Sequence, residues 1–355
     1  MAEIVNGESK STKPKPKKSV FIKVTFLKIS NIETVKEQFS ADVFIKARWR
    51  EPSLDHSKVS DNLKLDQYWN PKLVVQNVLG SPKQSSWKEL NFGKGGEAFI
   101  VEKRRIKGTF AEMLELRMFP FDFQDISVVL TSEHPIQELE ILEDEQELSS
   151  MNVSCFVDVQ EWELKDYVVT EAKQMTKEFS ETKNISFPLL TVKTLAVRQF
   201  GFFVWNILII MTIISLLSFT TFAVDNTKPQ NRLQLGFTLT LTGVTFRFVT
   251  NQSLPKISYL TKLDVYILFC MIFNFCISIW HAVITRFKDN SDQDSMDFWA
   301  FIIFIIIYSV FQLIYFMIVV GSEKAVKLIG ESWKSNRKVT SRSKVRDGRA
   351  SLFFG

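Results

Sequence analysis

Six carboxylates crowd one stretch of ten residues and are a first candidate for chemistry. Clustered carboxylates can raise one another's pKa or bind a divalent cation. Their spacing fixes no coordination geometry, so a solvated loop is the favoured interpretation. The three histidines and three cysteines are too few and too scattered for a zinc site, and we expect no metal and no cofactor. The acidic residues are Glu138, Glu140, Glu143, Asp144, Glu145 and Glu147.

Catalytic motifs are the next possibility. The glycine-rich stretch at residues 93–96 lacks the strand-then-helix context that phosphate binding requires. The sequence has neither a Gly-x-Ser-x-Gly nucleophile motif nor a His-Glu-x-x-His zinc motif. We therefore expect a protein that is not an enzyme. A membrane-anchored enzyme is a remote alternative, and no nucleic-acid partner is expected.

A polar stripe in a long segment carries a stronger signal. Residues 233–253 are long enough to cross a membrane, and six of them, in steps of three and four, share one helical face. Because a polar stripe is costly against lipid, it must face water or protein. Its hydroxyls either bond to neighbouring helices or line a pore with Leu241 as an apolar constriction, which requires a ring of subunits. The stripe is Gln234, Thr238, Leu241, Thr245, Phe248 and Gln252.

Three further segments have the length and composition of membrane-spanning helices. Residues 199–224, 265–285 and 298–320 contain no Asp, Glu, Lys or Arg, and about 20 apolar residues suffice to cross the hydrocarbon. With residues 233–253 they predict a four-helix transmembrane bundle within residues 199–320. Residues 321–355 are expected to form a basic tail. The Lys-rich residues 1–18, which lack aromatic side chains, are expected to be disordered.

The residues that precede the predicted helices have the pattern of β-strands. Apolar and polar residues alternate with period two over residues 39–49, which is typical of a half-buried strand. Residues 20–26, 156–170 and 189–197 show similar patterns, and turn-forming clusters separate them. Many short strands with turns between them predict a β-sandwich over residues 19–198.

A resemblance to a known family emerges from these segments. Phe119-Pro120-Phe121-Asp122-Phe123-Gln124 resembles the centre of the signature loop of pentameric ligand-gated ion channels, the Cys-loop receptor superfamily. Glu112 and Ile126 stand where animal receptors carry the two loop cysteines, so that disulfide is absent. The resemblance covers residues 19–320 and implies a β-sandwich ligand-binding domain followed by a four-helix transmembrane bundle. Further matches, in order, are Trp49 with Glu51-Pro52, Trp69-x-Pro71, Glu161-Trp162, Arg198 and Leu254-Pro255-Lys256.

The resemblance also implies how the two domains communicate. In the family, the signature loop packs against the linker that follows the pore helix. By that analogy, Asp122 should pair with Arg198, and Glu37 should reach Lys256. These contacts either transmit gating or only hold the domains together, and both need the same residues. The implied coupling residues are Glu37, Phe119, Pro120, Phe121, Asp122, Arg198 and Lys256.

Carried over position by position, the family's aromatic agonist box is incomplete in this chain. The family holds an ammonium ion there by cation–π attraction, whereas two of the five positions here are not aromatic. A conventional amine agonist is therefore not expected, and the agonist is an unidentified small molecule or a proton. The aromatic positions could equally belong to the core of the sandwich. The five residues are Phe44, Gln76, Glu133, Phe179 and Phe187.

The mouth of the implied pore is neutral. Gln230 and Asn231 occupy positions where cation channels of the family usually carry a Glu ring, which predicts weak selection by charge. The implied function is a subunit of a pentameric ligand-gated channel that assembles with four identical or homologous subunits in a lipid bilayer and passes inorganic ions. A non-conducting membrane receptor or scaffold with the same fold is the alternative.

The expected topology rests on two conflicting arguments. The resemblance places the sandwich and both termini outside the cell, with the cell membrane as location. The richer side in Lys and Arg is, however, the side of the sandwich, and the positive-inside rule would place it in the cytoplasm. Large folded domains follow that rule poorly, so the family topology is preferred.

Overall fold

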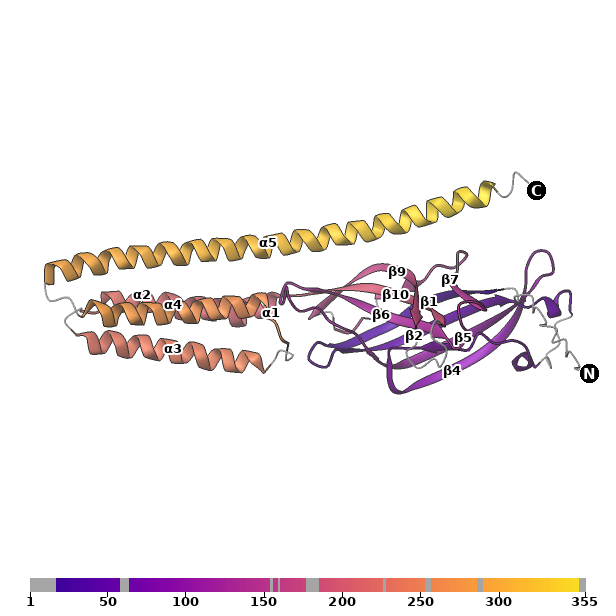
Figure 1. Ribbon diagram of the computed structural model, residues 1–355, viewed down its shortest axis with the longest axis horizontal. Helices are drawn as coiled ribbons and strands as arrows, with labels where there is room; N and C mark the ends of the chain where they lie inside the picture. Colours follow the sequence, from indigo (N-terminus) through magenta and orange to yellow (C-terminus); the bar gives the residue numbers. More distant parts are fainter. Residues whose placement is uncertain are drawn as a thin grey trace, which may run out of the picture.

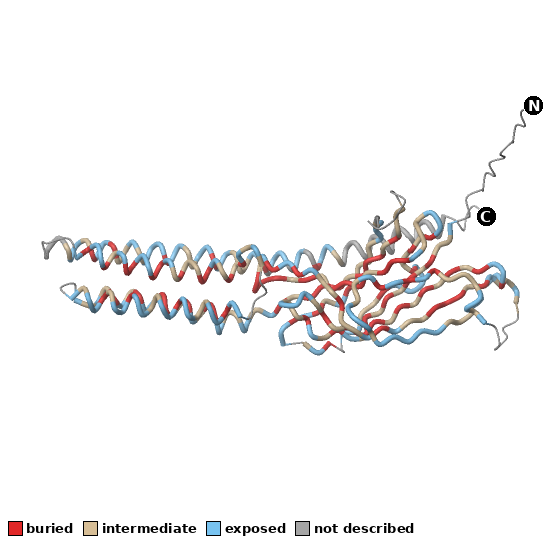
Figure 2. The backbone as a smooth tube through the Cα atoms, turned by 60° about the horizontal axis from the view of Figure 1, so that its bottom comes forward, coloured by how far each residue is buried: buried red, intermediate tan, exposed pale blue. Residues whose placement is uncertain are grey.

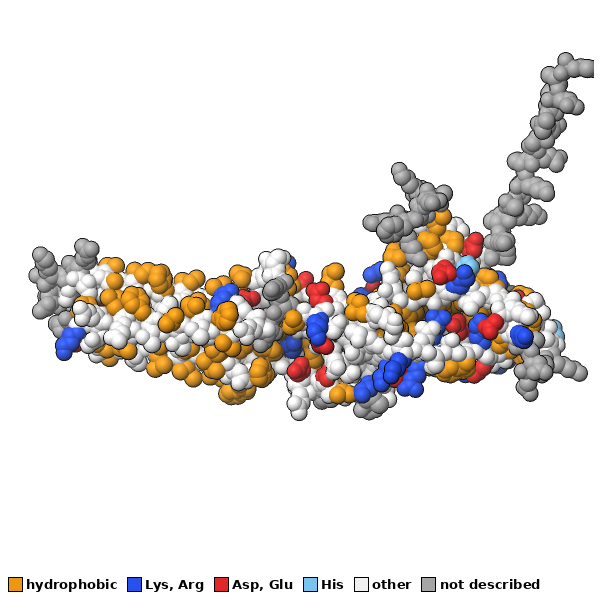
Figure 3. All heavy atoms as spheres, turned by 90° about the horizontal axis from the view of Figure 1, so that it is seen from below, with side chains coloured by type: hydrophobic (Ala, Val, Ile, Leu, Met, Phe, Trp, Pro, Cys, Tyr) orange, Lys and Arg blue, Asp and Glu red, His pale blue; other side chains and the backbone are white. Residues whose placement is uncertain are grey.

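The computed structural model shows an elongated molecule with a β-sandwich at one end and a bundle of helices at the other (Figure 1). It describes residues 17–57, 64–153, 156–158, 160–176, 185–225, 228–252, 257–285 and 290–350. Most of the expected disordered N-terminus lies outside these ranges. Apolar side chains cover much of the helical end, whereas Lys, Arg, Asp and Glu gather over the sandwich (Figure 3).

The sandwich consists of two sheets, as the strand patterns predict. In the six-stranded sheet the order is β4-β5-β2-β1-β7, with β8 paired to β1, and in the four-stranded sheet it is β3-β6-β10-β9. The first sheet contains β1 (Lys18–Glu33), β2 (Gln38–Arg50), β4 (Val78–Phe92), β5 (Ala98–Ala111), β7 (Leu139–Glu143) and β8 (Ser150–Met151). The second contains β3 (Leu73–Val75), β6 (Phe123–Ser132), β9 (Trp162–Thr176) and β10 (Ser186–Arg198).

The core lies between the sheets and follows the period-two pattern. Val20, Ile22 and Val24 on β1 are fully buried, and β2 pairs with β1 so that Val24 lies opposite Ile45. Figure 2 shows the resulting alternation of buried and less buried residues along the strands. The prediction of a strand over residues 156–170 is wrong at its start. Strand β9 begins at Trp162, after a tight turn closed by a bond from the Trp162 amide to the Asp158 carbonyl.

Four helical segments follow the sandwich. The first is continuous through α1 (Gly201–Phe203), a π-helical turn η4 (Val204–Leu208), α2 (Ile209–Phe219) and η5 (Thr220–Ala223). The others are α3 (Pro229–Asn251), α4 (Lys262–Ile284) and α5 (Asn290–Ala350). A capping box between Thr261 and Asp264 sets the start of α4. Two short 3-10 turns, η1 (Pro52–Leu54) and η2 (Leu65–Gln67), lie in the sandwich.

Three of these segments are long and apolar enough to cross a membrane: residues 201–223, 262–284 and 293–322. Helix α3 is not among them, because its polar residues lower its hydropathy. The lower hydropathy of α3 agrees with the sequence, where the corresponding segment differs from the other three by its polar stripe. The combination of sandwich and helical bundle confirms the predicted fold class.

Helix α5 continues well past residue 320, where the basic tail was expected to begin. In Figure 1 it passes the end of the bundle and runs beside the sandwich. Gly330 is buried there, and the ring of Trp333 meets the ring of Tyr167 on β9 with centroids 5.9 Å apart. A Cβ at residue 330 would stand 2.6 Å from the Tyr167 hydroxyl oxygen. A side chain at residue 330 would have to displace the Tyr167 hydroxyl, so glycine allows the close approach of α5 to β9. Tyr167 is only 4% exposed.

Candidate functional site: helix α3 and the domain junction

The six stripe residues of α3 all face away from the rest of the subunit. Each is exposed, and Leu241 and Phe248 each expose 67% of their surface. The buried face of the helix carries Arg232, Gly236, Gly243 and Thr250. Gly236 allows close packing against α4, because a Cβ there would lie 2.4 Å from the Ser278 hydroxyl oxygen.

The stripe hydroxyls are bonded within α3 itself. Thr238 Oγ1 donates to the Gln234 carbonyl at 2.8 Å, and Thr245 Oγ1 donates to the Leu241 carbonyl at 3.0 Å. Such bonds to the preceding turn satisfy the hydroxyl donor without a partner helix. Within one subunit, these hydroxyls therefore do not bond α3 to its neighbours, and their acceptor lone pairs are left toward the exposed side.

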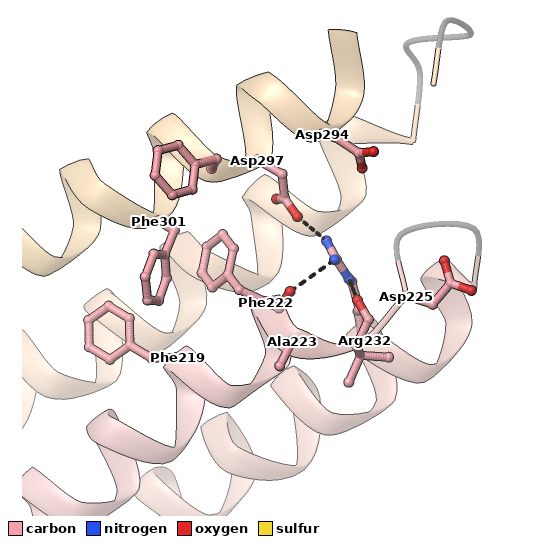
Figure 4. A pocket seen from close by; sticks show the side chains of 10 residues that line it. Phe219, Phe222, Ala223, Asp225, Arg232, Asp294, Asp297 and Phe301 are labelled. Carbon is pink, nitrogen blue, oxygen red and sulfur yellow. Dashed lines mark hydrogen bonds and ion pairs between the residues drawn. The ribbon is translucent and has the colours of Figure 1, made fainter. Parts of the chain in front are cut away.

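The first turn of α3 carries an arginine that faces away from the stripe. Gln230 and Asn231 are exposed, whereas Arg232 is buried and its Nη1 donates to Asp297 Oδ2 at 2.6 Å (Figure 4). Trp280 Nε1 donates to the other oxygen of Asp297 at 3.0 Å. The two pore-mouth candidates are thus uncharged, and the neighbouring positive charge is neutralised inside the bundle.

A buried ion pair joins the signature loop to the last strand. Arg198 Nε lies 2.7 Å from Asp122 Oδ1, and Arg198 Nη2 lies 3.2 Å from Asp122 Oδ2. The two side chains expose only 6% and 1% of their surface. The guanidinium also lies over the ring of Trp162, 4.1 Å from its centroid, and Gln124 Nε2 donates to Asp122 Oδ2. This geometry combines charge, bidentate hydrogen bonding and a cation–π contact.

The tip of the signature loop enters the helical bundle. Phe119 packs edge-on against Phe203 of α1 with centroids 4.7 Å apart, and Phe121 lies 5.1 Å from Phe200. The peptide bond between Phe119 and Pro120 is cis. The Phe119 carbonyl accepts from the Leu263 amide of α4 at 3.2 Å. The loop therefore contacts two helices as well as strand β10.

Two family models match this chain. The ligand-binding domain of neurotransmitter-gated ion channels matches residues 3–193, and the transmembrane region of the same channels matches residues 209–295. The chain belongs to the neurotransmitter-gated ion-channel family. It is therefore a multi-pass membrane subunit of the Cys-loop channel superfamily, whose members are receptors and channels rather than enzymes. Membership confirms the resemblance and implies assembly with other subunits around an ion path.

For the expected contact between Glu37 and Lys256 in this channel subunit, the structure places only Glu37. Glu37 lies in the turn between β1 and β2 with φ 51°, and its carbonyl accepts from the Glu112 amide. Lys256 lies outside the described residues. The linker instead reaches the loop through Tyr259, whose hydroxyl oxygen accepts from the Leu116 amide at 3.1 Å and whose ring lies under Arg117. Tyr259 lies three residues after Lys256 in the sequence, and no local pattern marks its side chain as a contact of the loop.

The four agonist-box positions that the structure describes do not all meet within one chain. Gln76 Nε2 lies 3.3 Å from the sulfur of Met175, which pairs in the sheet with Phe187. Glu133 forms an ion pair with Lys72. Phe44 lies in the other sheet, where it contacts Trp87, and Phe179 lies outside the described residues. A box from these positions would therefore require a second subunit.

The acidic stretch is mainly a structural element of the sandwich. Part of it is strand β7, and Asp144 is 2% exposed and accepts from Arg48 at 3.0 Å. Glu147 forms ion pairs with Lys23 and Lys46. Interpretation of the whole stretch as a solvated loop is therefore wrong. Glu140 and Glu143 lie on β7, whereas Asp144 and Glu147 form ion pairs with side chains of β1 and β2.

Glu112 is a titratable group close to the signature loop and to the turn between β1 and β2. Its Oε2 accepts from both the amide and the hydroxyl of Ser127 at 2.7 Å, with Asp125 and Lys193 nearby. Burial raises the pKa of this carboxyl to about 7, although the bonds from Ser127 oppose the shift. Glu112 therefore changes charge near neutral pH at the boundary between the sandwich and the helices.

We expect Glu112→Gln to remove a pH dependence of stability. The folded-state pKa lies above the ordinary value of 4.5, so the native state binds the proton more tightly, and the free energy of unfolding falls as pH rises from about 4.5 to 7. The variant, which stays neutral, should be more stable than the wild type above pH 7 by about 3 kcal/mol. Thermal unfolding at pH 5 and pH 8 measures this, with Glu115→Gln, an exposed carboxylate on the same loop, as control.

Proposed function

We propose that this chain forms the pore of a pentameric ligand-gated ion channel, with α3 of each subunit on the central axis. The observation that carries the proposal is the exposed stripe of α3, from Gln234 to Gln252, on a helix whose other face is buried. A polar stripe at membrane depth must meet water or protein. Its hydroxyls are already bonded within α3, which favours water.

The flanks of α3 support a ring of subunits. Leu235, Phe237, Val244 and Val249 lie beside the stripe and are 45%, 59%, 44% and 56% exposed in one subunit. Apolar flanks on both sides of a polar stripe suit contacts with neighbouring copies, because each copy would cover them while the stripe stays open toward the axis. The neutral Gln230 and Asn231 would then form the mouth and select weakly by charge.

The junction provides a direct mechanical connection from the sandwich to the pore. Strand β10 ends at Arg198, and α1 begins at Gly201, only three residues later. The Asp122–Arg198 pair ties this connection to the signature loop, whose tip contacts α1 and α4. A ligand that shifts β9 and β10 would therefore move the start of the first membrane helix and the loop together. The ligand itself would bind between Phe44 of one subunit and Gln76, Glu133 and Phe187 of the next.

Imaging and thiol accessibility test the proposal together. In lipid nanodiscs, projections of the purified protein should show fivefold symmetry with α3 innermost. In a conducting channel, a water-soluble thiol reagent should block current through Thr238→Cys and leave Phe237→Cys, on the exposed flank, unaffected. Wild type, which retains its own cysteines, is the control. Another symmetry, or block at both positions alike, would rule out this arrangement.

A further inference from the structure

Two charged residues interrupt the apolar row that strand β5 turns toward the core of the sandwich. The row includes Ala98, Ile100 and Ile106, which are at most 2% exposed. Glu102 and Arg104 share this face of the strand, because side chains two residues apart point to the same side. Glu102 is only 5% exposed. Since charged side chains are rarely buried without partners, both residues need hydrogen bonds inside the sandwich.

Arg104 bonds to Glu102 and also reaches the opposite sheet. Its Nη2 donates to Glu102 Oε1 at 2.7 Å, and its Nη1 donates to the Leu73 carbonyl of β3 at 2.8 Å. Strand β5 belongs to the six-stranded sheet and β3 to the four-stranded sheet, so the pair forms a polar bridge across the core. On the far side of this bridge, β3 and β6 end next to Gln76 and Glu133, two of the proposed agonist positions.

The second carboxylate oxygen of Glu102 is buried without a donor. Within the described part of the chain, no backbone or side-chain group donates a hydrogen bond to Oε2. A carboxylate oxygen that loses its hydration on folding and gains no donor raises the free energy of the folded state. A donor that is not part of the chain would remove this cost.

A small cavity beside Glu102 has room for such a donor. Its volume is about 10 Å³, which is close to the least space that holds one water molecule. In the pairing of β2 with β5, Ala47 lies directly opposite Glu102. A purely apolar cavity would stay dry, whereas the carboxylate and the guanidinium here offer water an acceptor and a donor. The lining residues are Ile45, Ala47, Leu73, Glu102, Arg104 and Leu130.

We propose that this cavity binds one water molecule as a fixed part of the sandwich core. The water donates a hydrogen to Glu102 Oε2, and its oxygen faces the Arg104 guanidinium. Both carboxylate oxygens then accept a hydrogen bond, which a buried ion pair needs in order to offset its loss of hydration. A metal ion is a poorer occupant, because Arg104 already supplies the positive charge and the other lining side chains are apolar. The site does not depend on the proposed channel function.

A density map of the full-length wild-type protein in lipid nanodiscs tests the site directly, at a resolution that shows ordered water elsewhere in the sandwich. We expect one peak in the cavity, about 2.5–3.0 Å from Glu102 Oε2. Three results would overturn the proposal. They are an empty cavity in such a map, a protein group that donates to Oε2 in place of water, and a peak with the several short oxygen contacts of a metal ion.

Replacement of the water by a serine hydroxyl gives a second test with a matched control. Ala47→Ser places a hydroxyl in the cavity, opposite Glu102, where it can donate to Oε2. Its melting temperature should equal or exceed that of wild type, because an immobilised water is released. Ala41→Ser makes the same change on the core face of the same strand, opposite Gly108, and should lower the melting temperature because it buries a hydroxyl away from any carboxylate. An equal decrease in both variants would also overturn the proposal.

Discussion

Replacing Arg198 by Met should destabilise the channel subunit by about 3–5 kcal/mol, because it strands the buried Asp122 carboxylate. Asp122→Asn should cost a similar amount by leaving the guanidinium between Trp162 and Phe119 without its counter-charge. The double variant should cost clearly less than the sum, since neither partner is then left alone. Thermal unfolding in detergent, combined with current recordings of each variant, gives the coupling energy for both stability and gating.

The Asp42–Arg105 pair is a matched control for this cycle. It has the same bidentate geometry, with Arg105 Nε 2.9 Å and Nη2 2.7 Å from the two carboxylate oxygens. Arg105 exposes 55% of its side chain, so the corresponding variants should cost about 0–1 kcal/mol. Strictly additive effects in the Asp122–Arg198 cycle would show that the pair contributes to neither stability nor gating. Coupling in stability together with additive effects on gating would show that the pair only holds the two domains together.

Features with a local repeating pattern could be predicted from the sequence. The period-two alternation of β1 and β2 identifies their buried faces, because one side of a sandwich sheet must face the core. The stripe of α3 is recognisable for a related reason, since a polar face at membrane depth has few permissible neighbours. The Asp122–Arg198 contact needed the family resemblance, because nothing in the spacing of residues 76 positions apart brings them together.

Contacts between segments that are far apart in the sequence produce no local repeating pattern, so they could not be predicted. Arg232 and Asp297 are 65 residues apart, and each reads as an isolated charge near the end of an apolar run. Gly330 gave no sign that α5 continues beside the sandwich, because its partner Tyr167 lies on β9. The acidic stretch was misjudged for the same reason. Its partners Arg48, Lys46 and Lys23 lie about a hundred residues earlier.

Leu241→Thr should raise the resting current of the channel about tenfold, which corresponds to about 1.4 kcal/mol in the equilibrium between closed and open pores. Leu241 is the aliphatic residue of the stripe and exposes 67% of its surface toward the proposed axis. A ring of leucines can close a pore by excluding water, and a hydroxyl in its place keeps the constriction wet. The substitution shortens the side chain as well, so both changes favour conduction.

The control for this prediction is Leu235→Thr on the same helix. Leu235 lies six residues before Leu241, about 120° away around the helix, and exposes 45% of its surface on the flank. The Leu235→Thr variant makes the same chemical change on the flank instead of on the stripe, so it should leave the resting current unchanged. Current is normalised to the number of channels at the cell surface, because either variant can alter assembly. Equal resting currents in Leu241→Thr and wild type at equal surface number would place the closed gate elsewhere, and a rise in Leu235→Thr alone would place that flank, rather than the stripe, on the axis.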